Sequence, residues 1–131
     1  MVARFVDTSY LLALSDASDS AHGAVLRDFG SREDEDLTTH GYVVAETLSL
    51  ARRRLGPDIT RRLIDELLPA LVVIAVDDGL HRETVRAFRD EVATGVSFVD
   101  RTSFAFMRSQ GIDTALALDR DFRTAGFRVL P

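Results

Sequence analysis

The sequence of 131 residues contains no cysteine and no lysine, and all 16 of its basic residues are arginine. The absence of cysteine excludes disulfide bonds, thiolate zinc sites and cysteine nucleophiles. The absence of lysine excludes mechanisms that use a catalytic lysine. The three histidines show no metal-ligand spacing, and no glycine-rich nucleotide-binding motif is present. Any catalytic site in this chain therefore has to be built without cysteine, lysine or a histidine-ligated metal.

Long hydrophobic runs are absent as well. The longest, residues 70–76, is far too short to span a bilayer. The N-terminal segment lacks the apolar region of a signal peptide, because Asp7 interrupts it early. We therefore expect a cytoplasmic protein with no membrane partner.

The net charge of −5 argues against a surface that binds polyanions everywhere. Local clusters of arginine can still contact phosphates. The densest cluster consists of Arg52, Arg53, Arg54, Arg61 and Arg62. It is either a solvated helix face or a contact surface for RNA phosphates.

Apolar segments typical of strands alternate with amphipathic segments typical of helices, and residues 1–131 form one predicted domain. Strands are predicted at residues 4–6, 37–39, 71–76, 114–118 and 127–130, with 71–76 as a buried strand. Helices are predicted at 9–14, from Ser18 or Asp19 as N-cap to 29, and at 41–54, 58–68, 80–93 and 101–109. In the helix 80–93, the residues predicted to face inward are Leu80, Val85, Phe88 and Val92. This alternation predicts an α/β fold with a mainly parallel sheet and helices on both faces.

Four acids lie inside or at the edge of apolar runs: Asp7 in FVDTS, Glu46 in VVAETLSL, Asp100 in SFVDRTSF and Asp119 in ALALDRDF. Burying a lone carboxylate is costly, so four of them in separate elements suggest one shared site. A divalent cation takes oxygen ligands and would neutralise their mutual repulsion. Asp7 and Asp119 end predicted strands, where open α/β sheets bind ligands. Glu46 is expected to face inward from its helix.

Each acid also has a purely structural interpretation. Asp7 and Asp100 can cap the helices that follow them. Glu46 can pair with an arginine, and Asp119 can be a turn residue. Asp121 is either an additional ligand or a solvated charge.

Asp77 and Asp78 in the segment VDDG provide a comparison. They also follow a predicted strand and precede a predicted helix. We interpret them as cap and turn residues.

The chain resembles PIN-domain ribonucleases, and more narrowly the VapC toxins of bacterial toxin–antitoxin pairs. The resemblance rests on four segments in order, FVDTSYLLAL, VAET, SFVDRTSFAFM and LALDRDFRTAGF. Together they cover essentially the whole chain. One such segment alone would be weak, but all four in this order at this length are specific.

The resemblance implies a three-layer α/β/α sandwich whose sheet gathers the acids at one end. It implies that Asp7, Glu46, Asp100 and Asp119 form the catalytic and metal-binding quartet, with Asp121 as an additional metal ligand. It further implies Mg²⁺ or Mn²⁺ as cofactor, endoribonuclease activity on RNA, a cognate antitoxin and a homodimer. Hydroxyls that would orient ligands or water belong to Thr8, Ser9, and Thr102 or Ser103.

The residue types fit this chemistry independently of the resemblance. Phosphodiester cleavage needs an activated water and stabilisation of charge on the phosphoryl group, and cations held by carboxylates supply both. Receiver domains and phosphatases of the haloacid dehalogenase type also bind Mg²⁺, but they need a lysine. Two alternatives stay open: an RNA-processing nuclease without an antitoxin, and an inactive module that binds a partner.

An antitoxin could silence such a site by placing a basic side chain against the acids. We also expect one of its segments to cover an apolar rim formed by residues 10–14 and 42–44.

Overall fold

Short strands connected by helices build one parallel sheet, and the computed structural model describes it over all of residues 1–131. The strands are β1 (Val2–Val6), β2 (Glu35–His40), β3 (Val72–Ile74), β4 (Thr114–Leu116) and β5 (Arg128–Leu130). The α-helices are α1 (Thr8–Ser15), α2 (His22–Gly30), α3 (Gly41–Leu55), α4 (Pro57–Arg62), α5 (Asp78–Asp90), α6 (Phe98–Gln110) and α7 (Asp121–Thr124). None of the helices is long and apolar enough to cross a membrane.

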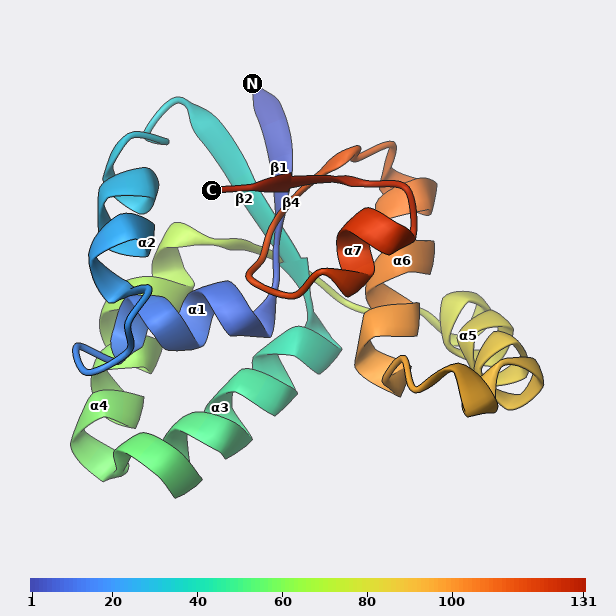
Figure 1. The fold of residues 1–131 in the computed structure, drawn as a ribbon, viewed down its shortest axis with the longest axis horizontal. Coiled ribbons are helices and arrows are strands. Elements are labelled where there is room, and N and C mark those ends of the chain that lie inside the picture. The colour runs from blue at the N-terminus through green and yellow to red at the C-terminus, as the bar shows by residue number, and fades with distance from the viewer.

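The strand order is β3-β2-β1-β4-β5, and every neighbouring pair is parallel. The chain therefore winds outward from β1 in both directions, which places a topological switch point between β1 and β4. Figure 1 shows α1, α2 and α4 on one side of the strands and α5, α6 and α7 on the other. The predicted α/β/α sandwich with a parallel sheet is confirmed.

The core lies on both faces of the two central strands. Phe5 and Val6 of β1 and Leu116 of β4 are fully buried, as expected for a parallel strand covered on both sides. Tyr10 of α1 covers one face, and Phe106 of α6 packs against Phe5 with ring centroids 5.9 Å apart. This core fixes the ends of β1 and β4 relative to each other.

The prediction of a buried strand at residues 71–76 is wrong in length and burial. β3 has three residues and lies at the edge of the sheet, where Val72 and Val73 are each 46% exposed. A β-branched apolar run is typical of any strand, and the sequence does not show whether a strand has one neighbour or two.

The predicted inward face of α5 is also partly wrong. Val85 is 44% and Val92 58% exposed, and the helix ends at Asp90. Thr84 is buried instead, between Leu80 and Phe88 at intervals of four residues. Its hydroxyl donates to the carbonyl of Leu80 at 2.8 Å, which offsets the cost of burying this polar residue.

Three other boundaries differ from the prediction. Helix α2 begins at His22 after Ala21, without a side-chain cap, and Asp19 instead accepts from the Ala21 N–H in the preceding turn. The predicted helix at residues 58–68 becomes α4, a π-turn (Leu63–Leu67) and a 3₁₀ turn (Leu68–Ala70) that contains the proline. Strand β2 begins at Glu35, two residues earlier than predicted, where Glu35 pairs with the largely buried arginines Arg4 and Arg32.

Candidate active site

Asp7 follows directly after β1 and caps α1. Its Oδ2 atom accepts hydrogen bonds from the Ser9 N–H at 3.1 Å and the Ser9 hydroxyl at 2.6 Å. The other oxygen, Oδ1, is buried and has no hydrogen-bond partner. Burial raises the pKa of Asp7 to about 6, and the nearby charge of Glu46 acts in the same direction. Asp7 is therefore a helix cap that also leaves one carboxylate oxygen free for a ligand.

The turn between β4 and α7 carries Asp119 to the same place. The Asp7 N–H donates to the carbonyl of Leu116 at 3.0 Å, which extends the β1–β4 pairing. The Ser9 hydroxyl accepts from the Leu118 N–H at 3.0 Å and so links Asp7 to this turn. Asp119 Oδ1 accepts from the Asp121 N–H at 2.8 Å, the turn interaction expected of a turn aspartate. The site thus lies at the switch point, beyond the carboxyl ends of β1 and β4.

Asp100 lies in the first turn of α6 and is only 8% exposed. It does not cap the helix as one interpretation held, because α6 begins at Phe98 and Ser97 is the N-cap, accepting from the Asp100 N–H at 3.0 Å. Burial raises the pKa of Asp100 to about 8, and the charges of Asp7, Asp119 and Glu46 contribute in the same direction.

The structure brings the acids from four parts of the chain together. Carboxylate oxygens of Asp100, Asp119 and Asp121 all lie within 4.8 Å of one another. Asp7 and Glu46 are close enough for their charges to act on Asp100. Glu46 is half-buried on α3, and none of the ion pairs in the structure includes it, so the arginine-pair interpretation is wrong.

An all-oxygen group of this kind suits a hard divalent cation. Two features of the protein fit such an ion: the unpartnered oxygen of Asp7, and the raised pKa values of Asp7 and Asp100. Asp77, the comparison residue, behaves differently. Its carboxylate caps α5 by accepting from the Leu80 N–H at 2.8 Å, as the sequence predicts.

Of the four candidate hydroxyl positions, Ser9 contacts an acid. The hydroxyls of Thr8, Thr102 and Ser103 donate to backbone carbonyls instead. Thr8 also accepts from the buried Thr47 hydroxyl at 3.1 Å, which ties the start of α1 to α3 one residue beyond Glu46. The signal for Ser9 is its position two residues after Asp7, the spacing of an aspartate turn.

His40, at the end of β2, is a structural residue that the sequence did not reveal. Its Nδ1 atom accepts from the N–H groups of Tyr42 and Val43 at 3.2 and 3.3 Å, and so caps α3. Its Nε2 atom lies 2.9 Å from the Ser103 hydroxyl. Burial lowers the pKa of His40 to about 4, so the ring is neutral and occupied on both nitrogens. It holds the start of α3, and hence the helix that carries Glu46.

Half of the predicted apolar rim at residues 10–14 and 42–44 belongs to the core. Four of these side chains are fully buried in the hydrophobic core and do not surround the acids: Tyr10, Leu11, Ala13 and Val43.

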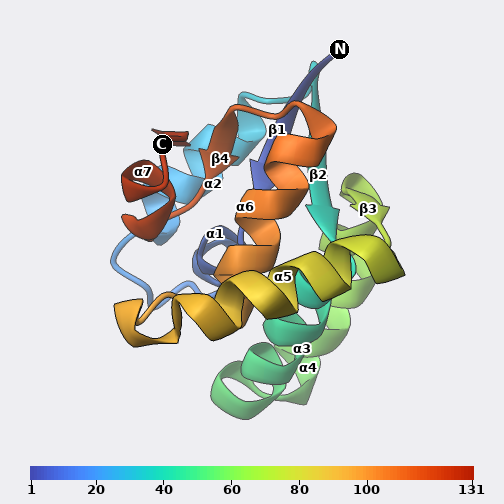
Figure 2. The same cartoon turned by 90° about the vertical axis from the view of Figure 1, so that its right-hand side faces the viewer.

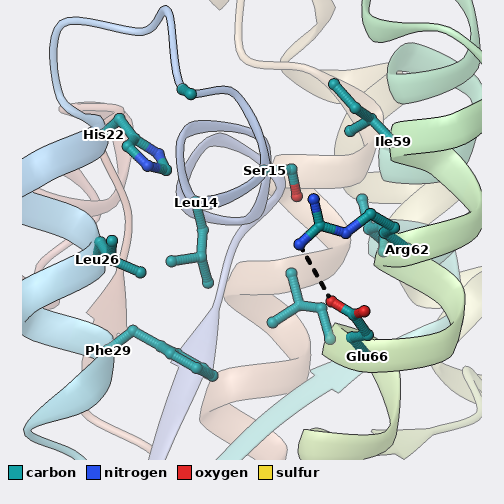
Figure 3. A pocket seen from close by; sticks show the side chains of 11 residues that line it. Leu14, Ser15, His22, Leu26, Phe29, Ile59, Arg62 and Glu66 are labelled. Carbon is teal, nitrogen blue, oxygen red and sulfur yellow. Dashed lines mark hydrogen bonds and ion pairs between the residues drawn. The ribbon is translucent and has the colours of Figure 1, made fainter.

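An apolar groove of about 490 Å³ lies instead at the other end of α1 from Asp7. Figure 3 shows it between α1, α2 and α4, with Leu14, Leu26 and Phe29 on its walls and the Arg62–Glu66 ion pair at its edge. None of the acids of the site lines it.

The arginine cluster lies at the end of α3 and on α4. Arg52, Arg53 and Arg54 are exposed in the last turn of α3, where positive charge complements the helix dipole. Arg61 and Arg62 are exposed and pair with Asp58 and Glu66. These positions agree with the solvated-face interpretation.

Known proteins share this fold and length. The family model described as PIN domain matches residues 4–128. The chain is 36% identical over 132 residues to the protein of Mycobacterium tuberculosis named 23S rRNA-specific endonuclease VapC20, covering 94% of each. The crystal structure of VapC20, described as a sarcin-ricin loop cleaving toxin, matches with a TM-score of 0.85 at 35% identity over 94% of this chain and 95% of that one.

More distant structures share the fold alone. DNA-bound VapBC from Salmonella typhimurium has a TM-score of 0.73 at 14% identity, covering 99% of this chain and 98% of that one. FitAcB from Neisseria gonorrhoeae has a TM-score of 0.71 at 17% identity, covering 100% and 97%. A parallel sheet with acids beyond the carboxyl ends of its central strands places this chain among the α/β proteins that carry their site at a switch point. The chain belongs to the PIN-domain family and, within it, to the VapC-type proteins.

Proposed function

We propose that this chain is an endoribonuclease toxin that cleaves cellular RNA with a divalent cation. The observation that carries the proposal is the buried, unpartnered Oδ1 atom of Asp7 beside a cluster of acids. Carboxylate oxygens of Asp100, Asp119 and Asp121 lie within 4.8 Å of one another, and the charges of Asp7 and Glu46 act on Asp100. A cluster of acids alone would be ambiguous. A buried carboxylate oxygen without a donor has lost its hydration without a replacement, which a cation would supply.

The residues that would hold the cation are Asp7, Glu46, Asp100, Asp119 and Asp121. Their oxygen-only character favours Mg²⁺ or Mn²⁺ over zinc, which prefers nitrogen and sulfur ligands. When bound, such a cation lowers the pKa of water and stabilises negative charge on the phosphoryl group.

The other side chains of the site position these acids. Ser9 holds Oδ2 of Asp7 and leaves Oδ1 without a protein donor. The Asp121 N–H holds Oδ1 of Asp119 and so fixes the orientation of that carboxylate. His40 is neutral and engaged on both ring nitrogens, so it is not a general base. The acids themselves are the groups left to bind, orient and exchange protons.

The substrate we propose is ribosomal RNA. The name of the M. tuberculosis relative specifies 23S rRNA, and the relative's crystal structure is described as that of a toxin that cleaves the sarcin-ricin loop. Identity of 36% over 94% of both chains supports a shared substrate class.

We further propose that a cognate antitoxin silences the protein in the cytoplasm and that the chain forms a homodimer. VapC-type membership supports the antitoxin. An RNA-processing nuclease without an antitoxin is the alternative, and a partner encoded next to the gene distinguishes the two.

The test is to incubate purified ribosomes with the chain and Mg²⁺ and to map new RNA 5′ ends by primer extension. We expect one dominant cut in 23S rRNA, lost with a chelator and lost in Asp100→Asn. Intact 23S rRNA with the folded wild type and Mg²⁺ would contradict the proposed substrate. Cleavage that persists at the normal rate in Asp100→Asn would contradict the proposed site.

A further inference from the structure

A second, smaller hollow of about 350 Å³ adjoins the acids. It is lined from α3 by Tyr42, Ala45, Glu46 and Ser49, and from α6 by Phe98 and Val99. Glu46 thus belongs both to the hollow and to the acid cluster. A molecule that occupies the hollow therefore lies next to one of the acids, Glu46.

Two aromatic rings line the hollow, Tyr42 and Phe98. His81 contacts both rings without lining the hollow itself, and we call the three residues the aromatic wall. The rings of Tyr42 and Phe98 are stacked, with centroids 6.1 Å apart and planes inclined by 27°. His81 of α5 meets both rings edge-on, at 5.9 and 6.1 Å. Its Nδ1 atom lies 2.7 Å from the Tyr42 hydroxyl. In Figure 2, α5 crosses in front of the lower end of α6, with α3 below it, so three helices build this wall.

The wall differs from the aromatic residues of the core. Phe5, Phe106 and Phe122 are almost fully buried and fill the space between the sheet and the helices. Tyr42 and Phe98 are only half-buried, and His81 is exposed. Packing alone therefore leaves the wall with accessible ring surface next to the acids.

We propose that the hollow binds an unpaired nucleobase of the RNA substrate, stacked on the aromatic wall next to the scissile phosphodiester. This inference rests on the proposed function and adds a recognition residue, Tyr42, to it. A base has a flat apolar face and a polar edge. The hollow offers the aromatic rings of Tyr42 and Phe98, and Ser49 and Glu46 offer polar groups.

The base has to be unpaired, because a base within a duplex already stacks on its neighbours and cannot reach a side pocket. The occupant is a base rather than an apolar side chain of a protein partner for two reasons. Two of the residues that line the hollow are aromatic, and aromatic rings are the side chains on which bases stack. The hollow is also continuous with the catalytic acids through Glu46.

The test is a double-mutant cycle between the protein and the RNA. The substrate is a synthetic RNA that spans the mapped cut, prepared with a single abasic nucleotide at each position around it. KM and kcat are measured for the wild type, Tyr42→Leu and Tyr42→Phe. Phe29→Leu, which removes an aromatic ring from the distant groove of Figure 3, is the matched control.

We expect one abasic position beside the cut to raise KM of the wild type by about 10-fold, the usual effect of losing one stacked base. Tyr42→Leu should raise KM on intact RNA by a similar factor, and the abasic nucleotide should then have no additional effect. Tyr42→Phe should restore KM, and Phe29→Leu should leave it unchanged. Mg²⁺ should raise the melting temperature of Tyr42→Leu as much as that of the wild type. An equal rise shows that the substitution has not disturbed Glu46, so that the higher KM comes from lost base binding.

Additive effects of Tyr42→Leu and the abasic nucleotide would overturn the inference while leaving the proposed function intact. So would a Tyr42→Leu variant that cuts RNA normally but no longer binds an antitoxin, because the hollow would then serve a protein partner. A folded wild type that cuts no RNA would overturn the proposed function itself, and the inference with it.

Discussion

At the scale of single residues, the buried acids Asp7 and Asp100 destabilise the folded protein in their charged form when no cation is bound. We predict that Asp100→Asn abolishes RNA cleavage and raises the free energy of unfolding of the cation-free protein at pH 8. One unit of raised pKa corresponds to about 1.4 kcal/mol, so the raised pKa of Asp100 sets an upper bound of several kcal/mol on the gain. Chemical unfolding in the presence of a chelator measures it.

The stability gained from Asp100→Asn should depend on pH. The folded-state pKa of Asp100 is raised from 3.8 to about 8, so the folded protein holds this proton more tightly than the unfolded chain. The free energy of unfolding contributed by Asp100 is therefore highest at low pH and falls as the pH rises through this window. The gain from Asp100→Asn should be smaller at pH 5 than at pH 8. An equal gain at both pH values would mean that the raised pKa of Asp100 is not its cause.

His40 should show the opposite dependence on pH. Its folded-state pKa is lowered from 6.5 to about 4, so stability is lost as the pH falls through this window. We predict that His40→Asn, which keeps a capping acceptor, removes this acid-dependent loss, whatever its effect at pH 8. Unfolding curves of both proteins between pH 4 and pH 8 test this. Parallel pH profiles would show that His40 is not the group responsible.

At the scale of secondary-structure elements, the sequence predicted those features that local pattern determines. The alternation of strands and helices, the cap at Asp77 and the turn at Asp119 were all visible as short motifs. Features that depend on distant contacts were not. The edge position of β3 and the first turn of α6 ahead of Asp100 follow from pairing and packing that a single segment does not encode.

The candidate site was likewise predictable where a local pattern marks it and not where distant contacts form it. The sequence located the acids because a carboxylate in an apolar run is unusual. It did not reveal that Ser9 joins Asp7 to Leu118, since that contact spans 109 residues. Nor did it reveal the aromatic wall, whose three rings come from three helices.

The junction between α1 and the β4–α7 turn supports a prediction at this scale. Ser9→Ala removes the donor to Asp7 Oδ2 and the acceptor of the Leu118 N–H. We expect the affinity for Mg²⁺ to fall by about 10-fold, as is typical when a group that orients a metal ligand is lost. Ser15→Ala is the matched control, because it removes a serine hydroxyl of the same helix that bonds only to the Leu11 carbonyl. Equal Mg²⁺ affinities in the two variants would exclude a positioning role for Ser9.

At the scale of the whole molecule, the charge of −5 places a limit on how RNA is bound. This total argues against polyanion binding over the whole surface, so we expect affinity to come from local arginines, base contacts and a cation at the acids. The exposed Arg52, Arg53 and Arg54 are available for phosphate contacts.

A toxin of this type has to be silenced by a partner, and this yields a prediction for the whole assembly. Co-expression with the neighbouring gene should give a stable complex whose RNA cleavage is strongly reduced relative to the free chain. A complex that cuts as fast as the free chain would contradict inhibition at the active site. If no neighbouring product binds, the RNA-processing alternative is favoured.

We propose above all that one catalytic cation site is formed by five acids, Asp7, Glu46, Asp100, Asp119 and Asp121. The most direct measurement is a titration of Mn²⁺ followed by electron paramagnetic resonance, in the wild type, Glu46→Gln, Asp100→Asn and Asp77→Asn. We predict saturable binding to the wild type, unchanged in Asp77→Asn, whose acid only caps α5, and weakened by at least about 10-fold in the other two variants. Equal Mn²⁺ affinity in the wild type and Asp100→Asn would contradict the account.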